Sequence, residues 1–578
     1  MELTGTELFV NALKSEGVEM VFGYPGGYVI DIFDELYRQD SIEVILPRHE
    51  QGLVHAADGY ARSTGKTGVC VVTSGPGATN LVTGIAAANY DSVPLVCFTA
   101  QVPTRLIGND AFQEADIVGI TRSVCKHSVM VRDRKDLNRI IKEAFYIART
   151  GKPGPVVVDL PKDVMAAMGD GEYPRDVNIR GYKPKIEIHT GQMLKALEML
   201  HSAQRPLFLI GGGVNIARAG GELTKLVDIT NVPVVTTIMG KGAIDSAHPM
   251  YIGNLGMHGS YAANLAVSRC DLLFSIGTRF NDRITGKASE FAPEAKIVHI
   301  DIDTAAISRN VKVDVPIVAD AKIALTKMLA YARECDVKGW IEQIGIWKRE
   351  YADSAGNGRN LPPKAIFAKL NAFFPEGIFV TDVGQHQMWA AQYLDLNENK
   401  RLLTSGGLGV MGYGLPAAIG ACLGNPGKRV VCIAGDGGFQ MNIQELATAA
   451  INGLPLIICV FNNGYLGMVR QWQELFYGKR YSATCLRRRR SCGRRCGGPN
   501  ENCPAYTPDF MKLAEGYGAA GIRVESADGI EPALRKAAEN TAAPTVLEFI
   551  LDMEELVMPM VANGKPLQEM LLGAEEAI

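Results

Sequence analysis

Short apolar runs that end at glycine turns recur along the chain and set the first expectation of its fold. Residues 429–434 read as a buried strand, residues 442–451 as a helix and residues 456–461 as a second strand. A helix between two such strands is typical of neighbouring strands in one parallel sheet. Their carboxyl ends then meet at one edge of the sheet, where open α/β sheets bind ligands.

The first third of the chain repeats this pattern. A strand over 68–73 ends at Ser74-Gly75-Pro76-Gly77, and a helical stretch leads to a strand that starts at Pro94-Leu95. In the last third the corresponding turn is Gly435-Asp436-Gly437, and the second strand starts at Pro455-Leu456. Two similar doubly wound α/β domains are the simplest explanation.

A third unit lies between them, bounded by the linker-like stretches Tyr182 to Gly191 and Arg349 to Lys364. Its expected strands cover 207–210, 272–277 and 297–303, and the first runs into Gly211-Gly212-Gly213. A strand entering a glycine turn lets backbone amides approach a pyrophosphate. The pattern alone leaves open whether this unit binds a dinucleotide or is a purely structural Rossmann-like domain.

Composition agrees with a large soluble enzyme. The 578 residues are 47% hydrophobic and 21% charged, with a formal charge of −3 that gives no reason to expect nucleic acid. No apolar run is long enough to span a bilayer, and the N-terminus enters an amphipathic pattern without a targeting segment. Eight of the twelve cysteines are scattered, several within apolar strands, which indicates free thiols in a reducing compartment such as the cytoplasm.

One spacing points to a metal-bound diphosphate. Asp436 closes the strand over 429–434, and Asn463 closes the strand over 456–461, so both side chains are expected at one edge of the sheet. Mg²⁺ prefers hard oxygen ligands together with phosphate oxygens and water. A carboxylate, an amide oxygen and the backbone carbonyl of Tyr465 would serve; the alternative is an ordinary glycine turn and an unrelated asparagine pair.

With these residues in view, the chain resembles the thiamine-diphosphate enzyme family, and within it the catalytic subunits of the acetohydroxyacid synthases (acetolactate synthases). The resemblance covers nearly the whole chain. The motifs that carry it, in order, are Gly23-Tyr24-Pro25-Gly26-Gly27, Arg48-His49-Glu50-Gln51, 108–114, Gly256-Met257-His258-Gly259, 279–283, 384–389, 406–414 and 463–472.

The resemblance implies a thiamine-diphosphate site shared by two domains. Glu50 would hydrogen-bond the aminopyrimidine ring, Met411 would bend the cofactor, and Gln113 would be a further catalytic residue. The remaining contacts to the cofactor are expected from Pro25, Gly26, Pro76, Asn80, Val383, Gly384, Gln385, His386, Gly409, Gly435, Gly437, Gly438 and Met468.

The resemblance also implies contacts to the substrates from several parts of the chain. Arg283 would bind the carboxylate of a 2-ketoacid through its planar fork, and Trp472 would favour 2-ketobutyrate over pyruvate as acceptor. Gly27, Phe112 and Met257 are the further walls. FAD is expected at Lys152, Gly211, Gly212, Gly213, Thr237, Met257, His258, Gly277, Arg279, Arg283, Asp301, Ile302 and Asp320.

The family fold implies three doubly wound α/β domains with parallel sheets. They are a pyrimidine-binding domain (1–182), a central FAD-binding Rossmann-like domain (190–345) and a diphosphate-binding domain (362–552), followed by a tail (553–578). The implied reaction is decarboxylation of pyruvate and ligation of its two-carbon unit to pyruvate or 2-ketobutyrate, at the entry to valine, leucine and isoleucine biosynthesis. A homodimer or larger assembly with interfacial active sites, and a small regulatory subunit, are the expected partners.

Two departures from the family pattern stand out. Tyr28 replaces a residue that is usually small, which predicts a narrower channel near the thiazolium. The stretch 485–503 is an apparent insertion that carries Cys485, Cys492, Cys496 and Cys503. Its spacing fits no standard zinc pattern, and a basic surface loop, a zinc or iron–sulfur site and a redox-sensitive disulfide all stay open.

Two other functions remain to be separated from this reading. A pyruvate oxidase shares the cofactors but passes electrons to FAD and on to oxygen or a quinone. A degenerate paralogue would act as a non-catalytic subunit, yet it would be expected to lack Glu50, Asp436 or Asn463, and all three are present.

Overall fold

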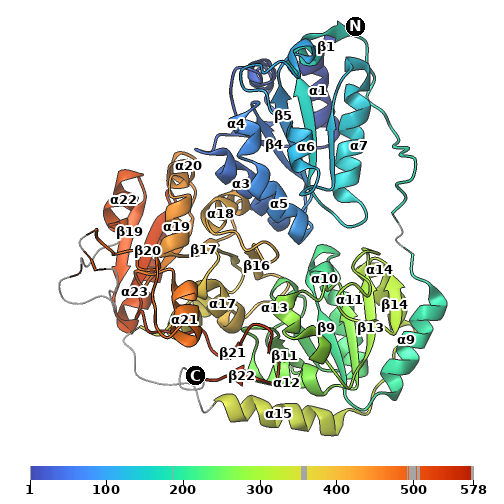
Figure 1. Cartoon of the computed structure of the whole chain (residues 1–578), viewed down its shortest axis with the longest axis vertical. Helices are drawn as coiled ribbons and strands as arrows, with labels where there is room; N and C mark the ends of the chain where they lie inside the picture. The colour runs from blue at the N-terminus through green and yellow to red at the C-terminus, as the bar shows by residue number, and fades with distance from the viewer. Residues whose placement is uncertain are drawn as a thin grey trace.

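Three six-stranded parallel sheets follow one another along the chain (Figure 1). The computed structural model describes residues 2–184, 187–352, 361–490, 492–493, 503 and 508–573. Every strand pair within the three sheets is parallel. The expectation of an α/β fold with three parallel sheets is therefore confirmed. In the described part of the chain, no helix has both the length and the apolar character needed to cross a membrane.

The first sheet has the order β3-β2-β4-β5-β7-β6. Its strands are β2 (Met20–Tyr24), β3 (Glu43–Ile45), β4 (Gly68–Val72), β5 (Leu95–Gln101), β6 (His127–Met130) and β7 (Val156–Pro161). Separate apolar clusters cover its two faces, as a doubly wound sheet requires. The helices are α1 (Gly5–Ser15), α2 (Ile30–Tyr37), α3 (Glu50–Thr64), α4 (Pro76–Thr79), α5 (Val82–Asp91), α6 (Ile117–Thr121), α7 (Leu137–Arg149) and α8 (Lys162–Ala166).

The central sheet has the order β11-β10-β9-β12-β13-β14. Counted within the domain this is 3-2-1-4-5-6, the Rossmann order. The strands are β9 (Pro206–Ile210), β10 (Val234–Thr236), β11 (Tyr251–Asn254), β12 (Leu272–Ile276), β13 (Lys296–Asp301) and β14 (Val315–Val318). Its helices are α9 (Thr190–Ser202), α10 (Gly212–Ile216), α11 (Gly220–Thr230), α12 (Tyr261–Arg269), α13 (Asp282–Thr285), α14 (Ala321–Leu329) and α15 (Lys338–Ala352).

The third sheet has the order β16-β15-β17-β18-β20-β19. Strands β15 to β20 take the places that β2 to β7 hold in the first sheet, so the internal repeat is a repeat of topology. The strands are β15 (Ile378–Thr381), β16 (Arg401–Thr404), β17 (Val430–Gly435), β18 (Ile457–Asn462), β19 (Ala520–Val524) and β20 (Thr545–Ile550). The helices are α16 (Pro363–Phe373), α17 (Gln385–Tyr393), α18 (Gly414–Gly424), α19 (Asp436–Met441), α20 (Glu445–Ile451), α21 (Gly467–Phe476), α22 (Phe510–Gly516) and α23 (Ile530–Glu539).

Two sequence expectations need correction here. The helix expected over 442–451 is α20, which begins later, at Glu445, and a separate helix, α19, precedes it with Asp436 as its first residue. The break falls at Asn442, whose side-chain amide donates to the Gly412 carbonyl at 2.7 Å. The second linker does not begin at Arg349, because Trp347 packs on Trp340 and helix α15 continues to Ala352.

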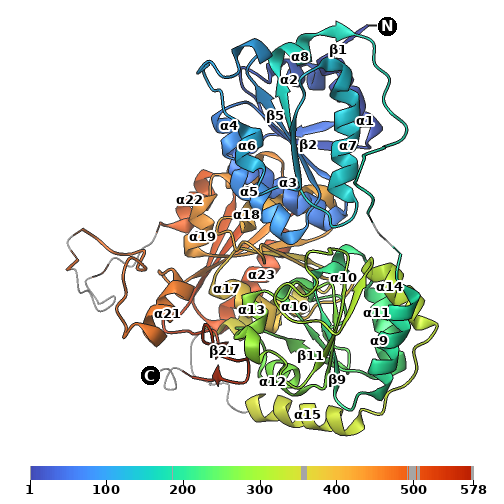
Figure 2. The ribbon, with the colours of Figure 1, turned by 45° about the vertical axis from the view of Figure 1, so that its right-hand side comes forward.

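Two contacts bring the domains together around one region (Figures 1 and 2). Helix α3 packs directly against α18: a Cβ on Gly59 would overlap the Ala417 carbonyl, and one on Gly420 would overlap the Ala56 carbonyl. The chain after β20 returns to the central domain, where the Val561 amide donates to the Met257 carbonyl at 2.8 Å. The tail includes β21 (Met560–Val561) and β22 (Met570–Leu571), which pair with each other.

Candidate functional site

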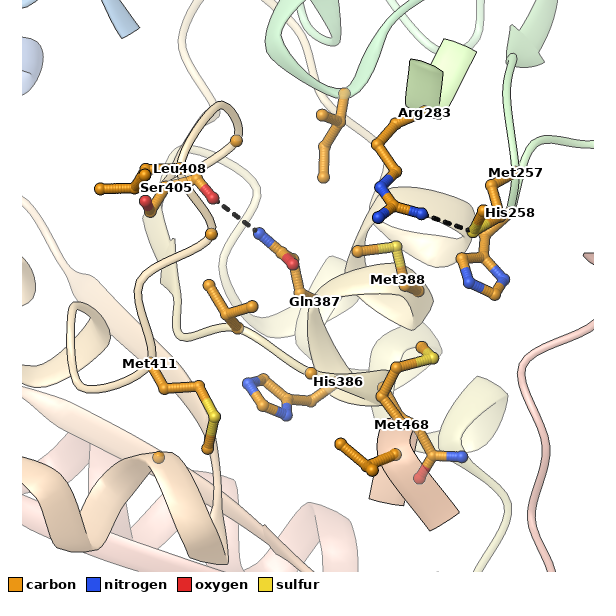
Figure 3. A pocket seen from close by; sticks show the side chains of 18 of the residues that line it. Met257, His258, Arg283, His386, Gln387, Met388, Ser405, Leu408, Met411 and Met468 are labelled. Carbon is orange, nitrogen blue, oxygen red and sulfur yellow. Dashed lines mark hydrogen bonds between the residues drawn. The ribbon is translucent and has the colours of Figure 1, made fainter. Parts of the chain in front are cut away.

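A cavity of about 1400 Å³ lies between the central domain and the third domain. The central domain contributes the loops after β11 and β12, and the third domain contributes the carboxyl ends of β15, β17 and β18 together with α21. This is the edge at which open parallel sheets bind ligands. Figure 3 shows Arg283 and His258 facing it from one side and Met411 from the other.

The three expected metal ligands all line this cavity: Asp436, Asn463 and Tyr465. Asp436 is buried, and its Oδ2 accepts the Gly464 amide at 3.0 Å. Burial raises the pKa of Asp436 to about 7, although backbone hydrogen bonds oppose this shift. A bound cation would stabilise the ionised carboxylate, so the oxygen donors and their setting fit Mg²⁺.

A buried amide network fixes the orientation of Asn463. Its Nδ2 donates to Gln385 Oε1 at 3.2 Å, while its Oδ1 accepts the Tyr465 amide at 3.1 Å. Gln385 Nε2 in turn donates to Gln471 Oε1 and to the Glu555 carbonyl. The site therefore depends on α17, α21 and the tail at once; Gln471 and Glu555 had no recognisable signal in the sequence.

The third-domain residues expected to hold thiamine diphosphate come together in the lining. These are Val383, Gly384, Gln385, His386, Gly409, Met411, Gly435, Gly437, Gly438 and Met468. Burial lowers the pKa of His386 to about 3, and its buried Nε2 has no hydrogen-bond partner among the described residues. A neutral imidazole beside glycine turns is suited to a phosphate oxygen.

The expected acceptor residues also share the cavity. Arg283, from the start of α13, points its Nη1 at the Met257 sulfur at 3.4 Å, as Figure 3 shows. Trp472 lines the cavity from α21. The guanidinium of Arg283, the thioether of Met257 and the indole of Trp472 thus line the same cavity, from the central and third domains.

The first-domain half of the expected thiamine-diphosphate site forms a separate cluster. Asn80 Nδ2 donates to Glu50 Oε2 at 3.0 Å, and a Cβ on Gly77 would lie 3.6 Å from Glu50 Oε1. Gln113, at φ 61°, packs on Gly75. None of the first-domain residues expected to bind thiamine diphosphate or substrate lines the cavity, namely Pro25, Gly26, Gly27, Glu50, Pro76, Asn80, Phe112 and Gln113.

The expected FAD residues divide into two groups. Lys152, Met257, His258, Arg279 and Arg283 line the cavity, whereas Gly211, Gly212, Gly213, Thr237, Gly277, Asp301, Ile302 and Asp320 do not. Close packing explains why Gly213 and Gly277 are glycines, because a Cβ on Gly213 would lie 2.7 Å from the Gly277 Cα. Asp320 caps α14 by accepting two backbone amides.

Unsatisfied polar atoms nevertheless mark the central wall as a binding surface. His258 Nδ1, Asn254 Oδ1 and Asn281 Oδ1 are buried without a hydrogen-bond partner among the described residues, and all three side chains line the cavity. Burial lowers the pKa of His258 to about 4, so the imidazole is neutral. A polar ring system such as a flavin would satisfy such atoms.

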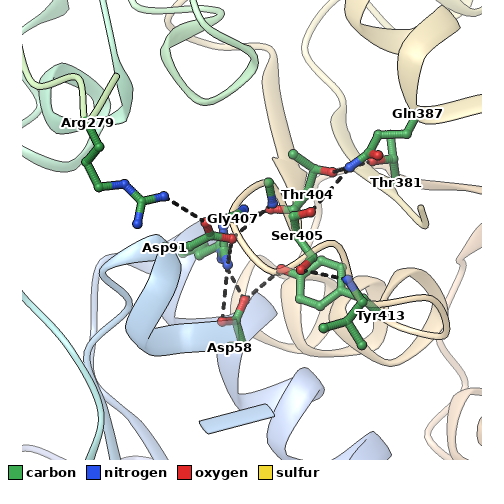
Figure 4. Close-up of polar contacts among 12 residues, drawn as sticks. Asp58, Asp91, Arg279, Thr381, Gln387, Thr404, Ser405, Gly407 and Tyr413 are labelled. Carbon is green, nitrogen blue, oxygen red and sulfur yellow. Dashed lines mark hydrogen bonds and ion pairs between the residues drawn. The ribbon is translucent and has the colours of Figure 1, made fainter. Parts of the chain in front are cut away.

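A buried charge network holds the glycine loop that carries Met411 (Figure 4). Asp91 accepts the amides of Gly406 and Gly407 at 3.0 and 2.8 Å and pairs with Arg62 at 2.9 Å. Arg62 also pairs with Asp58 at 2.6 Å. The sequence shows the Asp58–Arg62 spacing of a helical ion pair, but no sequence pattern links Asp91 to the glycine loop.

The two departures from the family pattern have different outcomes. Tyr28 is half-buried against the apolar core of the first domain, so within one chain its bulk is directed into that core. In the insertion, Cys485 and Cys492 are free thiols, Cys503 is half-buried, and Cys496 lies outside the described residues. The described residues contain no group of three or more His, Cys, Asp or Glu side chains arranged for a metal, and the three readings of this stretch stay predictions.

Family comparisons match all three domains. The N-terminal TPP binding domain, the central domain and the C-terminal TPP binding domain of the thiamine pyrophosphate enzymes match residues 3–120, 193–328 and 382–549. The acetolactate synthase large subunit of Corynebacterium glutamicum is 46% identical over 97% of this chain and 89% of its own length. The isozyme 3 large subunit of Escherichia coli K12 is 42% identical over 99% of both chains.

The chain belongs to the acetolactate synthase large-subunit family of thiamine pyrophosphate enzymes. A probable large subunit of Methanocaldococcus jannaschii, 44% identical over 97% of this chain and 94% of its own, extends the likeness to an archaeon. Thiamine diphosphate is therefore the cofactor of this fold, and the two halves of its expected site lie in the two domains whose sheets share one strand order.

Proposed function

We propose that this chain is a catalytic acetolactate synthase subunit, which decarboxylates pyruvate and ligates the two-carbon unit to pyruvate or 2-ketobutyrate in branched-chain amino-acid biosynthesis. One observation carries the proposal: a single cavity is lined by the Asp436–Asn463 loops and by Arg283 and Trp472. The first pair fits a metal-bound diphosphate, and the second fits the carboxylate and side chain of an acceptor 2-ketoacid.

Mg²⁺ and FAD complete the proposed set of cofactors. Asp436, Asn463 and the Tyr465 carbonyl would hold Mg²⁺, and the central wall with Lys152, His258 and Arg279 would hold FAD. Thiamine diphosphate supplies the electron sink that makes decarboxylation of a 2-ketoacid feasible. The volume of about 1400 Å³ exceeds what a single drug-sized ligand usually needs, which supports joint occupancy.

A second copy of the chain would complete the site. Glu50 and Asn80 hold a polar cluster outside the cavity, so a carboxylate for the aminopyrimidine nitrogen must come from elsewhere. A two-fold dimer would place Glu50 of one copy opposite the Asp436–Asn463 loops of the other. In the assembled site, Glu50 would hold a proton at that ring nitrogen, and Arg283 would orient the acceptor carboxylate. The names of the relatives as large subunits support a small regulatory subunit as a further partner.

A product assay tests the function directly. The purified chain, supplied with thiamine diphosphate, Mg²⁺ and FAD, is given pyruvate alone and then pyruvate with 2-ketobutyrate. Acetolactate in the first case, and acetohydroxybutyrate in the second, would support the proposal. Pyruvate-dependent oxygen uptake without either product would instead identify an oxidase.

A further inference from the structure

The start of the insertion is attached to the metal loop. The Leu486 amide donates to the Gly464 carbonyl at 3.0 Å, and the Leu466 amide donates to the Thr484 carbonyl at 2.9 Å. These two hydrogen bonds flank an antiparallel bridge between Tyr465 and Cys485. The next residue, Arg487, is therefore held next to the loop that contains Asn463 and Tyr465.

The Arg487 side chain lies over Gly464. A Cβ on Gly464 would overlap Arg487 Nε and lie 2.9 Å from its Cζ, so the guanidinium packs directly against this glycine. Gly464 has φ 74° and donates its amide to Asp436. Arg487 Nε is buried without a hydrogen-bond partner among the described residues, whereas Arg488, Arg489 and Arg490 are exposed.

The Arg487 side chain is half-buried, and among the described residues no carboxylate forms an ion pair with it. Removing a charge from water is costly unless something compensates it. Burial raises the pKa of Asp436, and the positive charge of Arg487 lowers it by a smaller amount. The loop that Arg487 covers is the one expected to hold a diphosphate. The negative charges of that diphosphate would compensate the positive charge of the guanidinium. Arg487 does not line the cavity itself, so its charge acts across the Gly464 backbone.

We propose that Arg487 is a positioning residue of the metal–diphosphate site, which places a positive charge beside Gly464 and increases the affinity for the diphosphate of the cofactor. The insertion would thereby contribute to cofactor retention. This inference rests on the proposed cofactor site.

Equilibrium binding of thiamine diphosphate in saturating Mg²⁺, followed by fluorescence or calorimetry, tests the inference without any assay of turnover. Arg487→Gln should weaken binding about tenfold, equivalent to about 1.4 kcal/mol, because it removes a positive charge that attracts the diphosphate across the Gly464 backbone. Arg487→Lys should restore most of the affinity. Arg489→Gln, in the same stretch but exposed, should bind like the parent chain.

Two further measurements separate charge from packing. The defect of Arg487→Gln should shrink at high salt, and it should be smaller for thiamine monophosphate, which carries less negative charge. Unchanged affinity in Arg487→Gln, or a defect in Arg487→Lys as large as that in Arg487→Gln, would overturn the inference. A parent chain that fails to bind thiamine diphosphate would instead refute the proposed cofactor site.

Discussion

At the scale of single residues, Trp472 offers the sharpest test of acceptor selection. We expect Trp472→Leu to keep acetolactate formation but to lower the preference for 2-ketobutyrate by about tenfold, because one methylene in an apolar pocket is worth about 1–3 kcal/mol. The ratio of the two products from mixed 2-ketoacids measures this. Phe476→Leu is the matched control, because Phe476 packs on Trp472 from the same helix but does not line the cavity. An unchanged ratio in Trp472→Leu would remove this residue from the acceptor wall.

A second residue-scale prediction concerns stability and pH. Burial raises the pKa of Asp159 to about 7, although Thr99 and Gln101 donate hydrogen bonds to its carboxyl group. The folded chain thus keeps a proton that the unfolded chain loses above about pH 4, so this group costs stability as pH rises from 4 to 7. When the pH is raised from 5 to 8, the free energy of unfolding of Asp159→Asn should rise by about 2–3 kcal/mol relative to that of the parent chain.

Urea unfolding of both chains at the two pH values measures this difference. Asp176→Asn, which removes one negative charge from an exposed position, should show no such trend. A difference between Asp159→Asn and the parent chain that stays constant with pH would mean that Asp159 is ionised in the folded state throughout this range.

At the scale of elements, the loop 405–411 depends on a charge in another domain. In Asp91→Asn the side chain would keep one acceptor oxygen in place of two, and buried Arg62 would lose a counter-ion. Breaking a buried ion pair costs about 3–5 kcal/mol. We expect faster hydrogen exchange over 404–414 and a lower unfolding temperature. Glu19→Gln breaks the exposed pair with Lys66 and should cost less than about 1 kcal/mol.

The insertion supplies a second element-scale prediction. If its four cysteines bind a metal, anaerobically purified chain should carry about one zinc ion or one iron–sulfur cluster beyond its magnesium. Changing Cys492 and Cys496 together to Ser should then abolish that metal and, because this stretch follows α21, lower activity. If elemental analysis finds neither zinc nor iron, the metal site is excluded, and the basic surface loop and the redox-sensitive disulfide remain as interpretations of this stretch. Activity that survives deletion of the stretch would favour the basic loop.

At the scale of the whole molecule, the sequence was most informative where local pattern and fold agree. Apolar runs located the strands, and the repeated glycine turns predicted two sheets of one topology. The placement of Asp436 and Asn463 at neighbouring strand ends followed from the same pattern. Contacts between distant segments left no periodic signal: Asp91 reaches Gly406 across the chain, and Arg487 covers Gly464 through an insertion that seemed unrelated to the site.

The division of the expected site between two regions of one chain leads to the last prediction. Glu50 and Asn80 form one cluster, while Asp436 and Asn463 line a cavity that includes none of the first-domain residues expected to bind thiamine diphosphate. If two copies share each site, Glu50→Ala and Asp436→Ala chains are each inactive, yet a mixed dimer contains one site with both residues intact. Mixing the two variants under conditions of confirmed subunit exchange should therefore restore up to about a quarter of the parent activity, since half of the dimers are mixed and each has one intact site. Glu50→Ala mixed with a second Glu50→Ala preparation is the control and should stay inactive. No recovery despite exchange would show that each active site is built within a single chain.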